Sequence, residues 1–310
     1  MNHRIALGTR GSELALTQSR LVEAALLARW PGIEIETKII KTSGDEIAGN
    51  IAPANAAAGR KGLFTAEIER ALLDQNIDVA VHSAKDLPSS IGTDTEIAAV
   101  LPRGEVDDVL VSRPGYDLES LPRDGRVATG SVRRRYQLGW NRPDLQIIDL
   151  RGNVPTRLRK LIREGWDAAI LARAGLERLG LIPNGSPIRF DEHELSVSVL
   201  PREVFVPAGG QGIVAMQIRS NDVRTRTLLE AVGDSDTRLC LRAEREFLRL
   251  LQGDCNQPVG VFAILDGTAM KVRAQVFRPG ETTPREAAVE GSHEDTVRLA
   301  AELLKQINAD

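Results

Sequence analysis

Apolar and polar positions in the first two-thirds of the chain follow two alternating periods. Residues 33–40 (IEIETKII) alternate apolar and polar side chains, which predicts a strand. Residues 12–29 have helical spacing, end before Pro31, and place Leu14, Leu21, Val22, Ala25 and Leu26 on one face. Further apolar runs predict strands at 77–82, 97–101, 109–112, 126–129, 145–150, 168–172 and 213–219. Strands that alternate with helices in this way predict an α/β fold.

The pattern changes after about residue 234. Residues 234–253 predict one amphipathic helix, capped by Asp234 or Ser235, whose apolar face holds Leu239, Cys240, Ala243, Phe247, Leu248 and Leu251. Runs at 259–265 and 270–277 flank an Asp-Gly turn and predict a β-hairpin, and a last helix is expected from about 295 to 307. The chain therefore ends in a small α+β domain.

The length and the irregular segments indicate how the chain divides. At roughly 100–200 residues per domain, 310 residues predict two or three domains. Pro and Gly at 102–104 and in VPAGGQG (206–212) mark irregular backbone that could cross between domains. We expect a first domain at 1–102 and 208–230, a second at 105–206 and a third at 235–310.

Composition narrows the class of protein. The chain is 42% hydrophobic and 27% charged, which is typical of a globular protein. It has no run of ~20 apolar residues that could cross a membrane, and its N-terminal residues lack the apolar segment of a secretory signal. Only two cysteines occur, too few for a disulfide framework. We expect a soluble, cytoplasmic protein with reduced thiols.

The charge is unevenly distributed. The net charge is −3, yet residues 126–178 contain twelve Arg or Lys against five acidic residues. On composition alone, solvated helix faces explain this segment as well as a functional site does. The alternative is a site for a polyanion, because guanidinium groups grip carboxylates or phosphates through two parallel bonds.

Lys85 and Asp86 come directly after a predicted strand, in HSAKDLP (82–88). In open α/β sheets, ligands bind beyond the carboxyl ends of the strands. A surface ion pair is the simpler interpretation. The functional one is a carboxylate near cations that stabilises a positively charged intermediate.

Three glycine turns each join a strand to a helix. They lie in TGSVRRR (129–135), DLRGNVPTR (149–157) and GTRGS (8–12). Backbone N–H groups at a helix N-terminus attract anions, so Ser131 could cap its helix while Arg133 and Arg134 extend the site. Each turn is a weak signal alone, but two of them lie inside the basic segment.

The two cysteines differ in their surroundings. Cys240 lies on the apolar face of its predicted helix, which predicts a buried and inert thiol. Cys255 follows that helix in a Gly/Pro loop, where a thiol can be reached and modified. The four histidines are scattered, so no metal site is predicted, and neither a P-loop nor a dinucleotide motif occurs.

Eight ordered motifs together resemble the hydroxymethylbilane synthase (porphobilinogen deaminase) family along nearly the whole chain. The most specific are VHSAKDLP and TGSVRRR. The matching runs lie at 8–18, 61–73, 78–88, 129–135, 150–158, 174–181, 207–212 and 243–260.

The resemblance implies a fold and an activity. The fold is α/β, with two periplasmic-binding-protein-like doubly wound domains plus a small α+β C-terminal domain. The activity is the stepwise condensation of four porphobilinogen molecules on a dipyrromethane cofactor, with loss of ammonia and hydrolytic release of hydroxymethylbilane. Cys255 would carry the cofactor as a thioether. Asp86 would be the catalytic carboxylate that stabilises the azafulvenium cation formed when ammonia leaves.

The resemblance also assigns the carboxylate-binding residues. Each pyrrole brings two carboxylates, so the product chain on its cofactor needs many cations. Cofactor binding would fall to Lys85, Ser131, Arg133, Arg134, Arg151 and Gly152. Substrate binding would fall to Arg10, Ser12, Lys61, Arg157, Arg178 and Gln211.

The chain departs from the family pattern at four places. Asp254 replaces a glycine before Cys255, and Asn256 and Gln257 follow that cysteine. Gly209 stands where an aliphatic residue is usual, which we expect to loosen the crossing segment. The small-residue loop at 51–59, predicted to be mobile, has Ala57 in place of a lysine, and the segment 182–200 is longer than expected, with no assigned role.

Two other functions fit parts of the sequence. A non-catalytic anion-binding protein of the periplasmic type would explain the fold and the arginines, but it predicts a secretion signal and gives Cys255 no purpose. Nucleic-acid binding would rest on residues 133–135, but the chain has few aromatic residues and a negative net charge. We therefore expect porphobilinogen as the small-molecule partner, no nucleic acid, no membrane, and a monomer.

Overall fold

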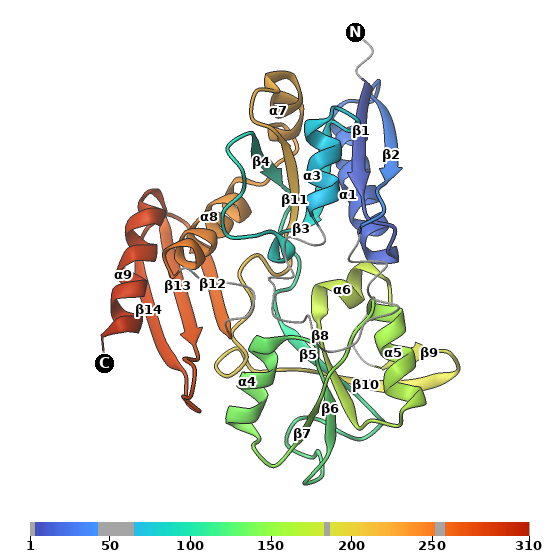
Figure 1. Cartoon of the computed structure of the whole chain (residues 1–310), viewed down its shortest axis with the longest axis vertical. Coiled ribbons are helices and arrows are strands. Elements are labelled where there is room, and N and C mark those ends of the chain that lie inside the picture. Colours follow the sequence, from blue (N-terminus) through green and yellow to red (C-terminus); the bar gives the residue numbers. More distant parts are fainter. Residues whose placement is uncertain (1–3, 43–64, 183–186, 252–257, 310) are drawn as a thin grey trace.

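The chain folds around three β-sheets, each with its own helices (Figure 1). The computed structural model describes residues 4–42, 65–182, 187–251 and 258–309. Several predictions lie outside these residues. They are the loop at 51–59 with Ala57, the substrate-binding Lys61, and Cys255 with its neighbours Asp254, Asn256 and Gln257.

The first sheet has five strands and is covered by helices on both faces. Its helices are α1 (Glu13–Arg29) and α7 (Val223–Glu230) on one face and α3 (Ala66–Leu73) on the other. Its strands are, in spatial order, β2 (Glu34–Ile39), β1 (Arg4–Thr9), β3 (Val79–Ser83), β11 (Val214–Arg219) and β4 (Thr95–Val100). β1 runs parallel to β2 and β3, whereas β11 runs antiparallel to β3 and β4.

The second sheet has six strands and is built in the same way. Its helices are α4 (Val132–Asn141) on one face and α5 (Val154–Arg163) and α6 (Arg173–Arg178) on the other. Its strands are, in spatial order, β7 (Gln146–Ile148), β6 (Arg126–Ala128), β8 (Ala168–Ala172), β5 (Asp108–Ser112), β10 (His193–Val199) and β9 (Ile188–Phe190). β6 runs parallel to β7 and β8, and β5 runs antiparallel to β8.

The segment 182–200 acquires a structural role. Its described part forms the β9–β10 hairpin, and β10 pairs antiparallel with β5 from Ser196 to Val199. The additional length therefore widens the second sheet by two strands.

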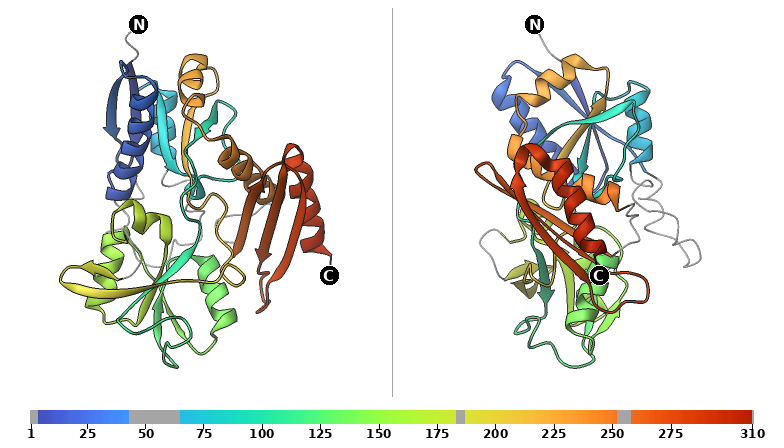
Figure 2. Two further views of the ribbon diagram at one scale, coloured as in Figure 1. Left: turned by 180° about the vertical axis from the view of Figure 1, so that it is seen from behind. Right: turned by 90° about the vertical axis from the view of Figure 1, so that its left-hand side faces the viewer.

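The third sheet is antiparallel, with the order β12-β13-β14. Its strands are β12 (Val259–Asp266), β13 (Ala269–Val276) and β14 (Arg285–Ser292), and its helices are α8 (Ser235–Leu250) and α9 (Thr296–Asn308). Figure 2 shows this sheet beside the other two, with the C-terminal helix at the outer edge of the molecule. The predicted fold class, two doubly wound α/β domains and a small α+β domain, is confirmed.

Two irregular segments connect the first and second sheets, at the positions that the sequence indicated. The chain leaves β4 for β5 through residues 101–107 and returns from β10 to β11 through residues 200–213. The two crossings bond to each other, because Gly104 N donates to Gly212 O at 3.0 Å.

A buried ion pair fixes these crossings to the third domain. The Arg103 guanidinium donates to both carboxylate oxygens of Glu244 on α8, at 2.7 and 3.2 Å, and its Nε donates to Gln211 O at 2.9 Å. Glu244 is fully buried and also accepts from Gly210 N and Ala263 N at 2.7 and 2.8 Å. A charged pair can be held in the interior because each lone pair has a donor.

That Gly209 loosens the crossing stays a prediction, but the structure shows why a small residue fits there. A Cβ at this position would lie 2.9 Å from both Leu248 and Val261. The ends of these two side chains, from α8 and β12, occupy the space that a side chain at position 209 would need, so they would have to shift to admit one.

Most helix and strand positions agree with the sequence prediction. Asp234 caps α8 as expected, with a side chain that accepts from Thr237 N, and Ser12 caps α1 in the same way by accepting from Ala15 N. One face assignment was wrong, because Leu21 of α1 is 41% exposed while Val22 and Leu26 are buried. In the described part of the chain, no helix is long and apolar enough to span a membrane.

Candidate active site

Lys85 and Asp86 lie in a short 3-10 turn, η3 (Ala84–Asp86), directly after the buried strand β3. The returning crossing packs against this turn, with Ala84 N donating to Ile213 O at 3.0 Å. Gly210 has a φ of +77°, and a Cβ there would lie 2.9 Å from Lys85 N. A glycine is therefore required for the crossing to support the turn that carries Asp86.

A cavity of about 80 Å³ opens beside Asp86. Arg10 and Ser12, predicted substrate ligands from the start of α1, lie in its wall together with Asp86. The other lining residues are Leu14, Ala15, Gln18, Thr65, Val81, His82 and Ser83. The structure thus brings Asp86 together with Arg10 and Ser12, two predicted site residues that lie more than 70 positions before it in sequence.

Lys85 is half-buried beside the predicted ligand Gln211. Its Nζ donates to Gln211 Oε1 at 3.3 Å, and the Gln211 amide donates to Asp108 Oδ1 at 2.9 Å. Burial and the positive charge of Arg134 together lower the pKa of Lys85 to about 8, although the charges of Asp86 and Asp108 act in the opposite direction. An ammonium group held in this way gains from a second nearby anion.

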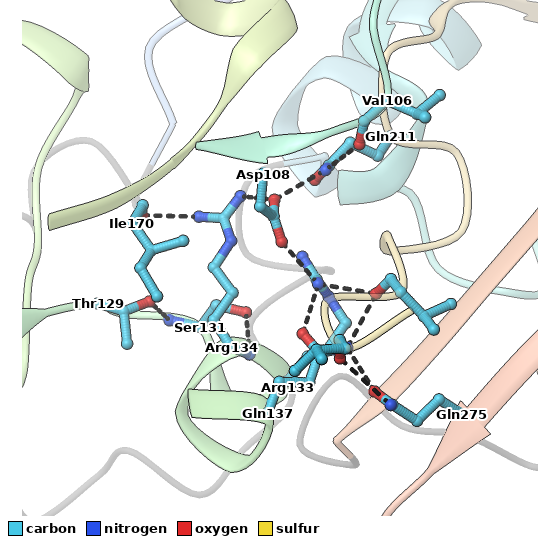
Figure 3. Close-up of polar contacts among 12 residues, drawn as sticks. Val106, Asp108, Thr129, Ser131, Arg133, Arg134, Gln137, Ile170, Gln211 and Gln275 are labelled. Carbon is cyan, nitrogen blue, oxygen red and sulfur yellow. Dashed lines mark hydrogen bonds and ion pairs between the residues drawn. The ribbon is translucent and has the colours of Figure 1, made fainter. Parts of the chain in front are cut away.

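Arg133 and Arg134 point from the first turn of α4 toward one carboxylate, that of Asp108 on β5 (Figure 3). The distances are 2.8 Å from Arg133 Nη1 and 2.7 Å from Arg134 Nη2, and both arginines are only 5% exposed. Burial would raise the pKa of Asp108, but the two guanidinium charges hold it well below its usual range. Ser131 caps the helix as predicted, accepting from Arg134 N.

Arg133 also joins the second domain to the third. Its Nη1 donates to Gln137 Oε1 and to Val206 O, both at 2.8 Å. Gln137 in turn donates to Gln275 of β13 at 2.7 Å (Figure 3). The Nε atoms of Arg133 and Arg134 are buried without a hydrogen-bond partner among the described residues. Each guanidinium therefore retains an N–H donor beyond its pairing with Asp108.

The start of α5 supplies the remaining basic residues. Asn153 caps this helix, and Arg157 Nε donates to Gly152 O at 2.7 Å. Burial and the charge of Arg134 lower the pKa of Arg157 to about 10, and Asp86 opposes this. Arg151 instead lies at the surface, paired with Asp149 at 2.8 Å.

Arg178 has a different neighbour from the other predicted ligands. Its Nη2 donates to Gly212 O of the crossing at 2.6 Å, and burial lowers its pKa. It therefore connects α6 to the crossing segment. Among the predicted ligands, Asp86, Lys85, Arg134 and Arg157 form one electrostatically coupled group from two domains.

Sequence reasoning missed four residues of this region: Gln18, His82, Asp108 and Gln217. Gln18 lies one helical turn after Leu14, and both line the cavity, so helical spacing could have indicated it. His82 was within a quoted motif but had no assigned role. Asp108 and Gln217 carry no local signal, because their partners lie 25 or more residues away in sequence.

The described residues contain no cluster of three or more His, Cys, Asp or Glu side chains that could hold a metal ion. Cys240 is buried and free, as predicted. Burial raises the pKa of its thiol to about 11, so it is protonated at neutral pH.

Two family models match the chain. Residues 5–227 match "Porphobilinogen deaminase, dipyromethane cofactor binding domain" and residues 238–309 match "Porphobilinogen deaminase, C-terminal domain". Together they cover nearly the whole sequence, and their border coincides with the start of α8.

Curated relatives carry the same name. The porphobilinogen deaminase of Moorella thermoacetica is 41% identical over 98% of this chain and 93% of its own length. Those of Syntrophobacter fumaroxidans and Acidithiobacillus ferrooxidans are 44% and 43% identical, covering 85% and 94% of this chain and 81% and 91% of their own lengths.

Solved structures are more distant. The methionine-binding protein MetQ aligns with a TM-score of 0.43 and 11% identity, over 76% of this chain and 92% of its own. A probable amino-acid ABC transporter extracellular-binding protein from Bacillus subtilis aligns with a TM-score of 0.41 and 12% identity, over 75% and 90%. The fold assignment rests on the strand order of the sheets and not on these low scores.

The sequence and the comparisons agree. The resemblance seen in the motifs, the transferase class and the dipyrromethane cofactor are confirmed, and the non-catalytic alternative is not supported. The chain belongs to the porphobilinogen deaminase family.

Proposed function

We propose that this enzyme is a hydroxymethylbilane synthase that joins four porphobilinogen molecules head to tail on a dipyrromethane primer, with Asp86 as its catalytic carboxylate and Cys255 as the attachment point. The observation that carries the proposal is the place of Asp86, which shares a cavity wall with Arg10 and acts electrostatically on Lys85 of its own turn and on Arg157 of α5. The cations suit a substrate that carries several carboxylates. The carboxylate of Asp86 suits the positive charge that the substrate acquires briefly during the reaction.

The described residues fit the cofactor. Dipyrromethane brings four carboxylates, and the site offers cations whose pKa values are lowered by burial and by one another. Arg133 and Arg134 each retain a buried Nε without a partner in the described chain. A carboxylate placed there would satisfy a donor and reduce the repulsion between like charges.

Each predicted ligand is proposed for one of two roles. Lys85, Ser131, Arg133, Arg134, Arg151 and Gly152 would hold the cofactor. Arg10, Ser12, Lys61, Arg157, Arg178 and Gln211 would hold substrate carboxylates. When bound, the dipyrromethane supplies the nucleophilic pyrrole carbon for the first condensation.

Asp86 acts on the incoming porphobilinogen. Its carboxylate lies in the cavity wall beside Arg10, where it can accept the pyrrole N–H of the substrate. As the C–N bond to ammonia breaks, positive charge develops on the pyrrole and its methylene carbon. A fixed carboxylate stabilises that charge without having to reorganise. Arg10 and Ser12 orient the substrate through its carboxylates.

The difference between the two thiols supports Cys255 as the attachment point. Cys240 is only 6% exposed, and its raised pKa makes it a poor nucleophile. Cys255, which follows α8 in the sequence, is the one other cysteine.

We also propose that the enzyme works in the cytoplasm as a monomer. The proposed domains are residues 1–102 with 208–230, residues 105–206 and residues 235–310. The crossings at 101–107 and 200–213 support these bounds.

Intact mass tests the attachment. The purified enzyme should carry an added mass of two pyrrole units, which Cys255→Ser should abolish and the matched control Cys240→Ser should retain. An active wild-type enzyme with the mass of the bare polypeptide would refute the assignment.

The role of Asp86 is tested by Asp86→Asn. An amide has nearly the same shape but no charge, so turnover should fall on the order of 10²-fold or more while the thermal midpoint stays unchanged. Ammonia release measures the rate. A variant with near-normal kcat would show that Asp86 is only a turn residue.

A further inference from the structure

A chain of hydrogen bonds crosses the first sheet beneath the active-site cavity. His82 of β3 bonds through Nε2 to Gln217 Oε1 of β11 at 3.0 Å. Gln217 Nε2 donates to Thr95 Oγ1 of β4 at 2.8 Å and approaches Glu69 Oε1 of α3 at 3.4 Å. The three strands are neighbours in the sheet, and the series ends at a carboxylate. The mechanism above uses none of these four residues.

The order of partners fixes where the protons lie. Thr95 Oγ1 contacts two groups that can only accept, Glu69 Oε1 at 3.1 Å and Gly92 O at 3.4 Å, so its hydroxyl donates to one of them. Thr95 Oγ1 must then accept from Gln217. The Gln217 amide therefore turns its nitrogen to Thr95 and its oxygen to His82.

His82 consequently carries its proton on Nε2, and Nδ1 holds the lone pair. The imidazole is also neutral, because burial lowers the pKa of His82 to about 4. The bond to Gln217 and the charge of Asp86 oppose this effect, and the charge of Arg10 adds to it. Asp86 and Arg10 are the charged groups that share the cavity wall with this ring.

Each condensation requires a proton acceptor, and His82 lines the same cavity as Asp86. After the methylene carbon of a substrate bonds to the α-carbon of the terminal pyrrole, that carbon must lose its proton to restore the aromatic ring. Asp86 is already engaged in stabilising positive charge. A weak base suffices, since a ring that recovers its aromaticity gives up the proton readily.

We propose that His82 Nδ1 accepts the α-proton of the terminal pyrrole in each elongation cycle, held in the correct tautomer by Gln217, Thr95 and Glu69. The C–H bond breaks, its electron pair returns to the ring, and an N–H bond forms at Nδ1. The proton then passes to the ammonia lost by the substrate in the same cycle. Ammonium leaves, and His82 is neutral again. This inference rests on the proposed function and adds a residue to it.

The first test uses porphobilinogen deuterated at its free α-carbon, with the holoenzyme and His82→Gln. Glutamine places an amide near the position of Nε2 and can keep the bond to Gln217, but it has no base at Nδ1. We expect a loss of roughly 10²-fold or more in kcat. We also expect a primary isotope effect in the variant that exceeds that of the wild type, because proton removal becomes rate-limiting.

A purely structural role for His82 predicts a different result. The variant would then be slower with the isotope effect of the wild type, or would keep the wild-type rate, and either outcome overturns the proposal. Failure of the proposed function is distinguishable, because the wild type itself would then release no ammonia from porphobilinogen.

The second test reads the tautomer directly and needs no turnover. The chain has only four histidines, so nitrogen NMR of histidine-labelled holoenzyme can be assigned by comparison with His82→Gln. We expect the Nε2–H form at neutral pH. Thr95→Val, which lacks the orienting hydroxyl, should yield a mixture of tautomers and a lower kcat, and the matched Thr95→Ser should preserve both. An Nδ1–H form in the wild type would overturn the proposal.

Discussion

Two helices of this enzyme begin with the same cap, yet their arginines have different environments. At α1, Ser12 accepts from Ala15 N, and Arg10 precedes the cap and lines the cavity. At α4, Ser131 accepts from Arg134 N, and both Arg133 and Arg134 follow the cap and bond to Asp108. The sequence pattern of glycine, serine and arginine is nearly the same at both places.

The position of an arginine relative to the cap decides its environment. An arginine before the cap belongs to the loop and lies where a ligand can approach the helix N-terminus. One in the first turn projects toward the neighbouring strand, and at α4 that strand carries Asp108. The first helix start thus presents its charge to the cavity, while the second fixes the packing of its domain and retains one N–H per guanidinium for a ligand.

The largest effect is expected when the carboxylate that pairs with both arginines of α4 is removed. Asp108→Asn leaves two buried guanidiniums without their counter-charge, so the folded state should lose about 3–5 kcal/mol. The decrease in thermal midpoint measures the loss. Asp149→Asn is the matched control. Its pair with Arg151 lies at the surface, with side chains 49% and 46% exposed, and its loss should cost at most about 1 kcal/mol. Equal effects of the two substitutions would show that burial does not distinguish the pairs.

The architecture was largely predictable because it depends on periodicity. The strand at 168–172 was predicted with the bounds that it has, since it is a buried run between clear turns. β14 was missed because its sequence, REAAVEGS, is an edge strand with alternating exposed positions and few β-branched residues. The β9–β10 hairpin was missed because β9 has only three residues, and because β10 joins the sheet through β5, which is distant in sequence.

The site was only partly predictable, because local motifs do not reveal long-range partners. The strand-end position of Asp86 and the capping role of Ser131 follow from nearby residues, and both are seen. Nothing in the sequence around Asp108 distinguishes it from other strand residues. It nevertheless binds Arg133 and Arg134 and so determines where their side chains point. Only the folded chain places it opposite α4.

Substitutions of Arg157 and Arg134 separate the binding of a growing chain from the packing of the second domain. The side chain of Arg157 donates to a backbone carbonyl, Gly152 O, whereas that of Arg134 pairs with the buried carboxylate of Asp108. Arg157→Leu should weaken the binding of a growing chain by about 1.5–3 kcal/mol, or roughly 10- to 150-fold, with an unchanged thermal midpoint. Species with one, two or three added pyrroles should accumulate, as seen by intact mass during turnover.

Arg134→Leu should show the same accumulation together with a lower thermal midpoint. Arg157→Lys should rescue poorly, because lysine keeps the charge but lacks the planar fork that grips a carboxylate through two bonds. Uniform slowing of all stages, with wild-type proportions of every intermediate in both Leu variants, would mean that these arginines supply only a general positive field.

The smallest predicted effect compares the two caps themselves. Ser12→Ala and Ser131→Ala each remove one capping bond, of 3.3 and 3.4 Å, and each should cost about 1 kcal/mol of stability. Their effects on catalysis should differ. Ser12 lines the cavity beside Asp86, so its loss should raise the KM for porphobilinogen as well. Ser131 lies in the proposed cofactor region, and because the cofactor stays covalently attached, its loss should leave that KM nearly unchanged. Steady-state kinetics on both variants gives the answer, and equal KM values would show that substrate does not reach the start of α1.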